Sequence, residues 1–198
     1  MKNDEWGAVA YLSKSKYGKQ NEEIWINNSS SYITGAAGNS VSAGSNTGTT
    51  NDYTSTQGVK ASTTGTVYGV YDMSGGATEY VAAYVNNGHG NLISYGSSLV
   101  NGEAKMKNVY SKASSDNNTN NYYANSSKYG DAVYETSTIG SGTTSWYGDY
   151  YNFPNTSDPF FLRSGAYSNN TNAGVFCFNR YHGKLESFVS FRPVLVAL

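Results

Sequence analysis

The stretch at residues 65–85, "GTVYGVYDMSGGATEYVAAYV", carries the densest apolar cluster in the first half of the chain. Its apolar members are Val67, Val70, Tyr71, Met73, Tyr80, Val81, Tyr84 and Val85. Asp72 and residues 74–76 interrupt the cluster, because a polar residue followed by glycines favours a turn. We therefore expect this stretch to form core, as a strand or turn followed by a second short element through Glu79 and Tyr80.

Upstream of this core, residues 3–18, "NDEWGAVAYLSKSKYG", predict a short amphipathic helix. Asn3 or Asp4 can cap its first turn, and Gly18 can stop it. One side of this helix carries an apolar stripe, formed by Trp6, Val9, Ala10 and Leu12.

The remaining segments alternate long loops with short strand-like pieces. Residues 27–66 contain turn formers throughout, which predicts a long ordered loop. Residues 86–160 also predict loops, with strand-like pieces at 91–100 and 145–153. The end, "SFRPVLVAL" at residues 190–198, predicts an apolar closing strand, which Pro193 places at a strand start or a sheet edge. Few helices, short strands and long loops indicate an α+β domain.

Composition excludes several classes of partner. The chain has 198 residues, a net charge of -1 and 14% charged residues, so it offers no basic field for nucleic acid and no polybasic patch for lipid. No apolar run approaches the roughly 20 residues of a membrane span, and the first residues lack the pattern of a signal peptide. We expect a soluble chain of one domain, residues 1–198, without direct membrane insertion.

Cysteine, histidine and tyrosine usage narrows the chemistry further. A single cysteine excludes an internal disulfide, a CxxC redox pair and a multi-cysteine zinc site. His89 and His182 are far apart in the chain, and nothing marks them as metal ligands. The 19 Tyr and 22 Gly, with many Asn and Ser, are typical of recognition loops. The same composition also fits an uncharged, secreted, loop-rich protein.

A second informative stretch is "RSGAYSNNTNAGVFCFNRYHGKLESFVSFRPVL", residues 163–195. Strand-like runs alternate there with residues that suit neither a core nor an ordinary solvated loop. Scaffold positions are expected at Arg163, Gly165, Gly174, Phe176, Phe178, Phe191 and Arg192. Alternation along residues 175–179 places Cys177 and Asn179 on the side opposite Phe176 and Phe178, which face the core.

Three segments resemble one known family. "GVYDMSGGATEYV" at residues 69–81 resembles the Gly-Leu-Tyr-Asp-Met-x-Gly-Asn-Val-Trp-Glu-Trp signature of the formylglycine-generating-enzyme, or sulfatase-modifying-factor, family. "RSGAY" at 163–167 and "SFRPV" at 190–194 resemble its closing Arg-Gly-Gly-Ser-Trp and Gly-Phe-Arg segments. The resemblance implies a C-type-lectin-like fold, in which a small twisted antiparallel sheet and one or two helices support long loops.

The chain departs from that family where the chemistry would lie. Gly76, Thr78 and Tyr80 replace an Asn and two Trp of the signature, and Ser164 and Ala166 alter the closing motif. The enzymes of the family use a pair of cysteines that bind copper, whereas this chain has Cys177 alone, and one thiolate cannot make a two-sulfur site. The resemblance therefore does not imply an enzyme here. The sugar-binding triplets of calcium-dependent lectins do not occur either, and a structural calcium ion elsewhere stays open.

The same fold occurs in the variable proteins of diversity-generating retroelements, which this chain also resembles in residues 163–192. In those proteins Asn codons are rewritten to NNY codons, which reach Ala, Tyr, Ser, Cys, His, Leu, Phe, Val and Asn but not Lys or Glu. The resemblance implies a variable binding face at Ala166, Tyr167, Ser168, Cys177, Asn179, Tyr181, His182, Leu185, Ser187, Phe188 and Val189. Lys184 and Glu186 fall outside the reachable set. The eleven side chains of the variable face should gather on one exposed patch.

Three functions follow from these observations. The first is a display protein that binds a protein or other macromolecular ligand on a cell or phage-host surface, without nucleic acid and without a required cofactor. It would work extracellularly, on a cell surface or on a phage virion. The second is an oxidase of the formylglycine-generating type or a related peptide-modifying enzyme. The third is a structural module of a pilus, surface fibre or phage tail that is not diversified.

Overall fold

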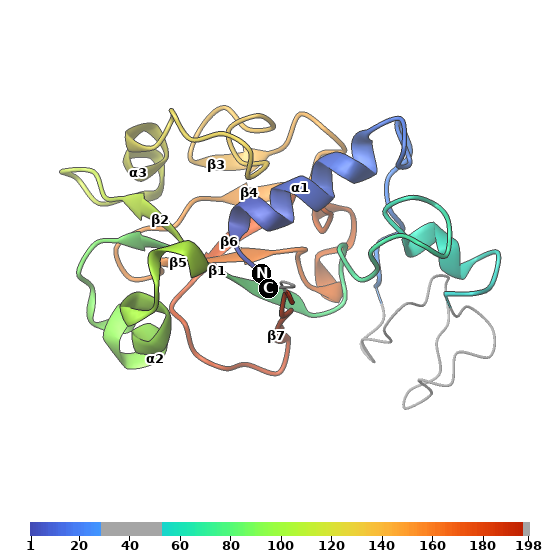
Figure 1. The fold of residues 1–198 in the computed structure, drawn as a ribbon. Coiled ribbons are helices and arrows are strands. Elements are labelled where there is room, and N and C mark those ends of the chain that lie inside the picture. Colours follow the sequence, from blue (N-terminus) through green and yellow to red (C-terminus); the bar gives the residue numbers. More distant parts are fainter. Residues whose placement is uncertain (29–52, 196–198) are drawn as a thin grey trace.

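The structure is a computed structural model that describes residues 1–28 and 53–195. Its elements are α1 (Asn3–Lys14), η1 (Gly58–Ala61), β1 (Thr78–Asn86), α2 (Gly90–Asn101), η2 (Ala104–Met106), β2 (Asn108–Ser111), α3 (Asn118–Ala124), β3 (Ser141–Thr143), β4 (Tyr150–Asn152), β5 (Phe160–Arg163), η3 (Tyr167–Asn172), β6 (Phe178–Tyr181) and β7 (Val189–Phe191). A curled open sheet and few helices make the fold mixed α+β, as the sequence predicts at that level (Figure 1).

Strand β1 is the centre of the sheet. The order is β2-β1-β5-β6-β4-β3, and β7 also pairs with β1. Glu79 pairs with Arg163 of β5 across one edge of β1 and with Ser190 of β7 across the other edge. The prediction of a small antiparallel sheet is wrong, because β1 runs parallel to both β2 and β7, and β4 runs parallel to β6. Long connections through helices and loops allow these parallel pairings.

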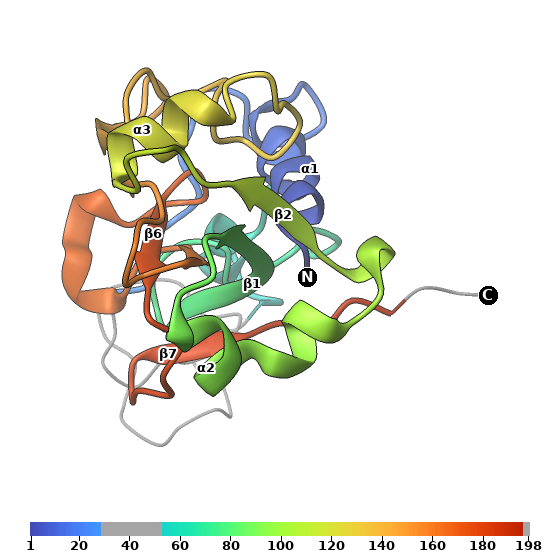
Figure 2. The same ribbon diagram turned by 90° about the vertical axis from the view of Figure 1, so that its left-hand side faces the viewer.

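The two faces of the sheet bury different clusters. Alternation along β1 directs Val81, Ala83 and Val85 into the main core, which α1 covers with Trp6 and Ala10. Figure 1 shows α1 and α2 on opposite sides of the sheet, and Figure 2 shows the same arrangement after a quarter turn. The first face is therefore packed by α1 and the loops beside it, whereas α2 covers only part of the second face.

Helix α2 covers its part of the second face through a small cluster of Tyr84, Leu92 and Phe160. Gly96 lets the helix approach, because a Cβ there would lie 2.4 Å from the ring of Phe160. The prediction of a strand-like piece at 91–100 is wrong. Leu92 and Leu99 both face this cluster, at a spacing of seven residues that fits two helical turns.

Helix α1 forms where the sequence predicts a helix, but both of its ends differ from the prediction. The N-cap is Lys2, whose backbone N–H donates to the Glu5 carboxylate at 2.8 Å. Asn3 does not cap the helix, because it is buried and donates to the Tyr110 hydroxyl at 2.7 Å. The helix ends at Lys14, before the predicted stop at Gly18.

The predicted core stretch at residues 65–85 is confirmed in its second half. Met73, Val81 and Val85 are buried in the main core and Tyr84 in the α2 cluster, whereas Val67 is exposed. Of the predicted long loop at residues 27–66, residues 29–52 lie outside the described residues. The described remainder includes η1 and several turns.

The end of the chain corrects two further predictions. The closing strand stops at Phe191, because Pro193 has no N–H to donate to a sheet. Val194 and Leu195 follow it and are exposed. Phe191, predicted as scaffold, is 77% exposed, although the other predicted scaffold residues upstream of it are buried.

Arg192 holds β7 against the centre of the sheet. Its Nε and Nη2 donate to both carboxylate oxygens of Glu79, at 2.9 and 2.5 Å. Its other donors reach the backbone carbonyls of Tyr71 and Asp72 at 3.0 and 2.8 Å. An arginine in the apolar closing segment predicts an acidic partner, with Glu79 and Asp72 as candidates, and the structure shows Glu79 as that partner. The pair is partly desolvated, since burial raises the pKa of Glu79 even though Arg192 opposes that shift.

We expect Arg192→Ala to lower the free energy of unfolding by about 3–5 kcal/mol, because it leaves the buried Glu79 carboxylate without a counter-charge. Thermal and denaturant unfolding would measure this loss. Lys105→Ala is the matched control, since Lys105 and Glu103 form an ion pair whose side chains are both 71% exposed. Such exposed pairs contribute about 1 kcal/mol or less. Equal effects of the two substitutions would contradict the structural role of Arg192.

Candidate ligand-binding site

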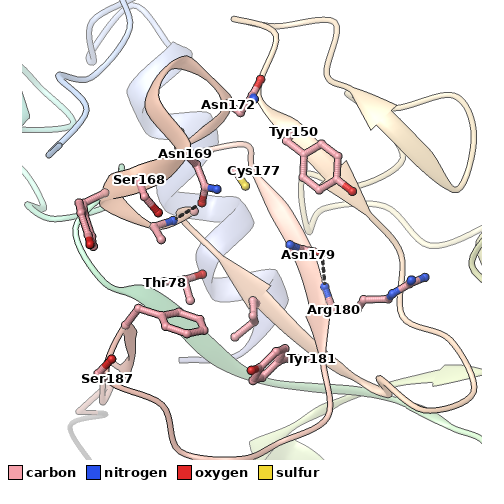
Figure 3. Close-up of a pocket in the computed structure, with 15 residues that line it drawn as sticks. Thr78, Tyr150, Ser168, Asn169, Asn172, Cys177, Asn179, Arg180, Tyr181 and Ser187 are labelled. Carbon is pink, nitrogen blue, oxygen red and sulfur yellow. Dashed lines mark hydrogen bonds between the residues drawn. The ribbon is translucent and has the colours of Figure 1, made fainter. Parts of the chain in front are cut away.

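A pocket of about 500 Å³ opens on the second face of the sheet, beside the part that α2 covers (Figure 3). Its floor is the sheet itself, where Leu162 of β5 pairs with Asn179 of β6, and Thr78 of β1 lies nearby. The pocket is lined by Thr78, Tyr150, Leu162, Gly165, Ala166, Tyr167, Ser168, Asn169, Asn172, Cys177, Asn179, Arg180, Tyr181, Ser187 and Phe188.

One wall of the pocket is η3, which a tight turn after β5 brings over the sheet. Ser164 and Gly165 both adopt positive φ, at 76° and 73°. Gly165 is required there, because a Cβ would lie 2.8 Å from Ala173. The Tyr167 N–H donates to the Gly76 carbonyl at 2.7 Å, which ties η3 to the turn before β1. This wall therefore has a fixed position on the scaffold.

The opposite wall comes from the segment between β6 and β7. The rings of Tyr181 and Phe188 meet edge to face, with centroids 6.1 Å apart. The Phe188 carbonyl accepts a hydrogen bond from the Thr78 N–H at 2.9 Å. The Tyr80 hydroxyl donates to the Lys184 carbonyl at 3.2 Å. These contacts attach the wall to β1, so its position depends on the pairing of β7 with β1.

The pocket brings together eight of the eleven residues predicted for the variable face. They are Ala166, Tyr167, Ser168, Cys177, Asn179, Tyr181, Ser187 and Phe188. The predicted alternation is confirmed, since Phe176 and Phe178 lie in the main core while Cys177 and Asn179 line the pocket. The expectation of a wholly exposed patch is wrong for Ala166 and Cys177, which are buried because η3 and its turn cover them.

The other three predicted residues lie outside this pocket. His182 packs against the rings of Tyr181 and Tyr95, with centroids 4.0 and 6.1 Å apart. Leu185 is 90% exposed at the outer side of the β6–β7 segment. Val189 belongs to β7 and pairs with Thr78. These three residues surround the β6–β7 wall instead of facing the cavity.

Sequence reasoning missed several residues that line the pocket. Asn169, Asn172 and Arg180 lie within residues 163–195. Nothing in the sequence distinguishes them from the loop and strand residues beside them. Tyr150 and Leu162 come from other strands, far away in the sequence. No local pattern could have identified them, because strand pairing alone brings them to the site.

A buried carboxylate supports the floor from below. Asp149 is fully buried, and its Oδ2 accepts the Phe176 N–H at 2.9 Å. This bond fixes the turn at residues 174–177, which carries Cys177 into the pocket. Asp149 Oδ1 and Glu23 Oε1 are both buried and receive no hydrogen bond from the described donors. The two side chains interact with each other, and this interaction is a hydrogen bond only when one of the two carboxyl groups holds a proton.

The same burial shifts both acids toward the neutral form. Burial raises the pKa of Asp149 to about 8, and the negative charge of Glu23 adds to the shift. Burial raises the pKa of Glu23 to about 7, against the opposing effect of its hydrogen bond with Asp149. At neutral pH the folded pair therefore keeps a bound proton, whereas both carboxyl groups would be ionised in the unfolded chain.

Cys177 forms part of the pocket floor and has the properties of a structural thiol. It is 3% exposed, and burial raises its pKa, with the nearby Asp149 carboxylate adding to the shift. A thiol that does not ionise is a poor nucleophile and a poor metal ligand. Cys177 contributes to the pocket through its small side chain, which leaves space between η3 and β6.

Comparison with protein-family models, with curated proteins and with solved structures finds no match for this chain. Within residues 1–28 and 53–195, no group of three or more His, Cys, Asp or Glu side chains could hold a metal ion. No described helix is long and apolar enough to cross a membrane.

We expect the stability of the Asp149→Asn variant relative to the wild type to increase as the pH rises from 5 to 8.5. Unfolded carboxyl groups titrate near pH 4, so raised pKa values in the folded state make stability fall as the pH rises through about 4 to 8. The asparagine can still accept the Phe176 N–H. Melting temperatures across this range would measure the difference. Glu103→Gln, at an exposed site, should show no such trend, and a flat difference for Asp149→Asn would contradict the buried pair.

We expect Cys177 to react with iodoacetamide at least about tenfold more slowly in the folded protein than in denaturant, because burial suppresses its thiolate. Mass spectrometry of timed samples would measure both rates. The Cys177→Ser variant should fold and remain unlabelled, which confirms the assignment of the label. Rapid labelling of the folded chain would show that the thiol is open to reagents, contrary to its place in the floor.

Proposed function

We propose that this chain is a ligand-binding display protein whose closing segment, residues 163–192, is diversified by a retroelement. The observation that carries the proposal is the separation of the pocket from the core. The eight predicted variable residues in the pocket come from three separate parts of that segment, and none of them belongs to either core cluster. Their side chains can therefore change while the packed clusters stay intact.

The proposed fold within the α+β class is C-type-lectin-like, of the formylglycine-generating-enzyme type. In support, the three segments that carry the resemblance meet in space. Glu79 of the first segment pairs with Arg163 of the second in the sheet and with Arg192 of the third through its carboxylate. Thr78 Oγ also donates to the Arg163 carbonyl at 3.0 Å. Segments far apart in the chain thus join at one point of the scaffold.

The side chains that line the pocket support a protein ligand in this proposal. Tyr150, Tyr167, Tyr181 and Phe188 offer aromatic area with few rotatable bonds, and Ser and Asn side chains offer adaptable hydrogen bonds. We place the ligand on a cell or phage-host surface, and the protein outside the cell, on a cell surface or on a virion. An oxidase is disfavoured in this proposal, because the single thiol is buried in its neutral form.

A pair of matched libraries tests the binding function. We expect a library at Tyr167, Ser168, Tyr181, Ser187 and Phe188 to keep melting within a few degrees of the wild type and to yield binders to unrelated protein targets. The control library changes exposed tyrosines outside the pocket, Tyr17, Tyr68, Tyr123 and Tyr129, which are at least 52% exposed. That library should stay folded and yield none, because its positions do not converge on one site.

Three outcomes would argue against the proposal. Loss of folding across the pocket library would show that these residues are structural. Equal yields from the two libraries would show that the pocket has no special role. Stoichiometric copper bound by the wild type and lost in Cys177→Ser would favour the oxidase instead. Inspection of the gene locus tests diversification separately, since a reverse transcriptase and a near-repeat of the 3′ end must lie nearby.

A further inference from the structure

Two asparagines that line the pocket have their side-chain oxygens occupied by the backbone. Asn169 Oδ1 accepts the Ala166 N–H at 2.6 Å, and Asn179 Oδ1 accepts the Arg180 N–H at 2.8 Å. These bonds fix the orientation of each amide, since a backbone N–H can donate only to the oxygen. Each side chain must therefore present its NH₂ group on the other side.

Both NH₂ groups are available to a ligand. Neither Nδ2 has a hydrogen-bond partner among the described residues, and both side chains line the cavity. Figure 3 shows Asn169 on the η3 side of the pocket and Asn179 on β6. The η3 wall and the sheet floor thus each hold an oriented donor, whereas the hydroxyl groups of Ser168 and Ser187 can turn to donate or to accept.

The charges around the pocket favour a neutral acceptor. No acidic side chain is among the described residues that line it, and Arg180 is the one charged residue in that set. The Arg180 guanidinium already faces the Asp158 carboxylate, with Nε 3.5 Å from Oδ2. A ligand carboxylate would therefore lose its hydration without gaining an unpaired positive charge. A carbonyl oxygen loses less on entering the same site.

On these grounds, and resting on the proposed binding function, we infer that the pocket recognises a peptide group of the ligand. Asn169 and Asn179 donate to its carbonyl oxygens, and the aromatic rings contact the adjoining side chain. Sugar hydroxyls fit less well, because each hydroxyl brings a proton that needs an acceptor, whereas a peptide carbonyl brings none and matches the two NH₂ donors. The expected ligand is thus an exposed, extended segment of a protein.

Substitution by aspartate tests the NH₂ donors of the two asparagines separately from their side-chain oxygens. Asn169→Asp and Asn179→Asp keep an oxygen for the backbone N–H but remove the NH₂ group, so the fold should be retained. Asn170→Asp is the matched control, because it adds the same charge to η3 at an exposed residue that does not line the pocket. The probes are N-acetyl-tyrosine N-methylamide, p-cresol as an aromatic ring without an amide, and N-acetylglucosamine as an amide on a sugar.

Two-dimensional NMR of the labelled protein reports side-chain NH₂ groups directly. We expect the peptide probe to shift the NH₂ signals of Asn169 and Asn179 and to bind at least about tenfold more weakly to Asn169→Asp and to Asn179→Asp, but not to Asn170→Asp. Melting temperatures of all three variants should stay near the wild type.

The outcomes separate this inference from the binding function. If p-cresol binds as well as the peptide probe, or if the variants bind the peptide probe unchanged, the pocket binds ligands without reading an amide, and the inference is wrong. Tighter binding of N-acetylglucosamine would overturn it in favour of a sugar. If no probe shifts any pocket signal while the pocket library yields binders, the inference alone fails. If both experiments fail, the binding function fails with it.

Discussion

The ion pair between Arg192 and Glu79 is the contact on which the pocket ultimately depends. It holds β7 beside β1, and the preceding residue Phe188 then bonds to the Thr78 N–H through its carbonyl. One wall of the cavity is therefore positioned by an interaction outside it. The amino group of Met1 adds to this junction by donating to the Arg192 carbonyl at 2.7 Å.

The location of the pocket follows from unequal cover of the two sheet faces. α1 and the loops around it pack against the first face, where Trp6 of α1 and the strand residues Phe161 and Phe178 belong to the main core. On the second face α2 reaches only the region around Phe160. η3 and the β6–β7 segment border the remaining area without filling it. Strand residues that point away from the core there, such as Leu162 and Asn179, line the cavity.

Sequence reasoning succeeded where local pattern decides the structure. Alternation through Phe176, Cys177 and Phe178 separated core from pocket, and an arginine in an apolar strand required an acidic partner such as Glu79. It failed where tertiary contacts decide. Leu92 lies in a helix because Phe160 is available to pack against it, and parallel pairing depends on connections that no local pattern encodes. Tyr150 reaches the pocket through such pairing.

The burial of Ala166 and Cys177 limits how much variety the site can hold. Both side chains lie beneath the cavity, where Gly165 already approaches Cys177 so closely that an added Cβ would come within 3.4 Å of its sulfur. A larger residue at either position would have to displace η3 or fill the cavity from below. In the diversified protein that we propose, the variants that still present an open site would therefore be far fewer than the codons permit. Sequence changes that keep the site open would concentrate at the rim of the pocket. Ala166 and Cys177 would set how deeply a ligand can enter.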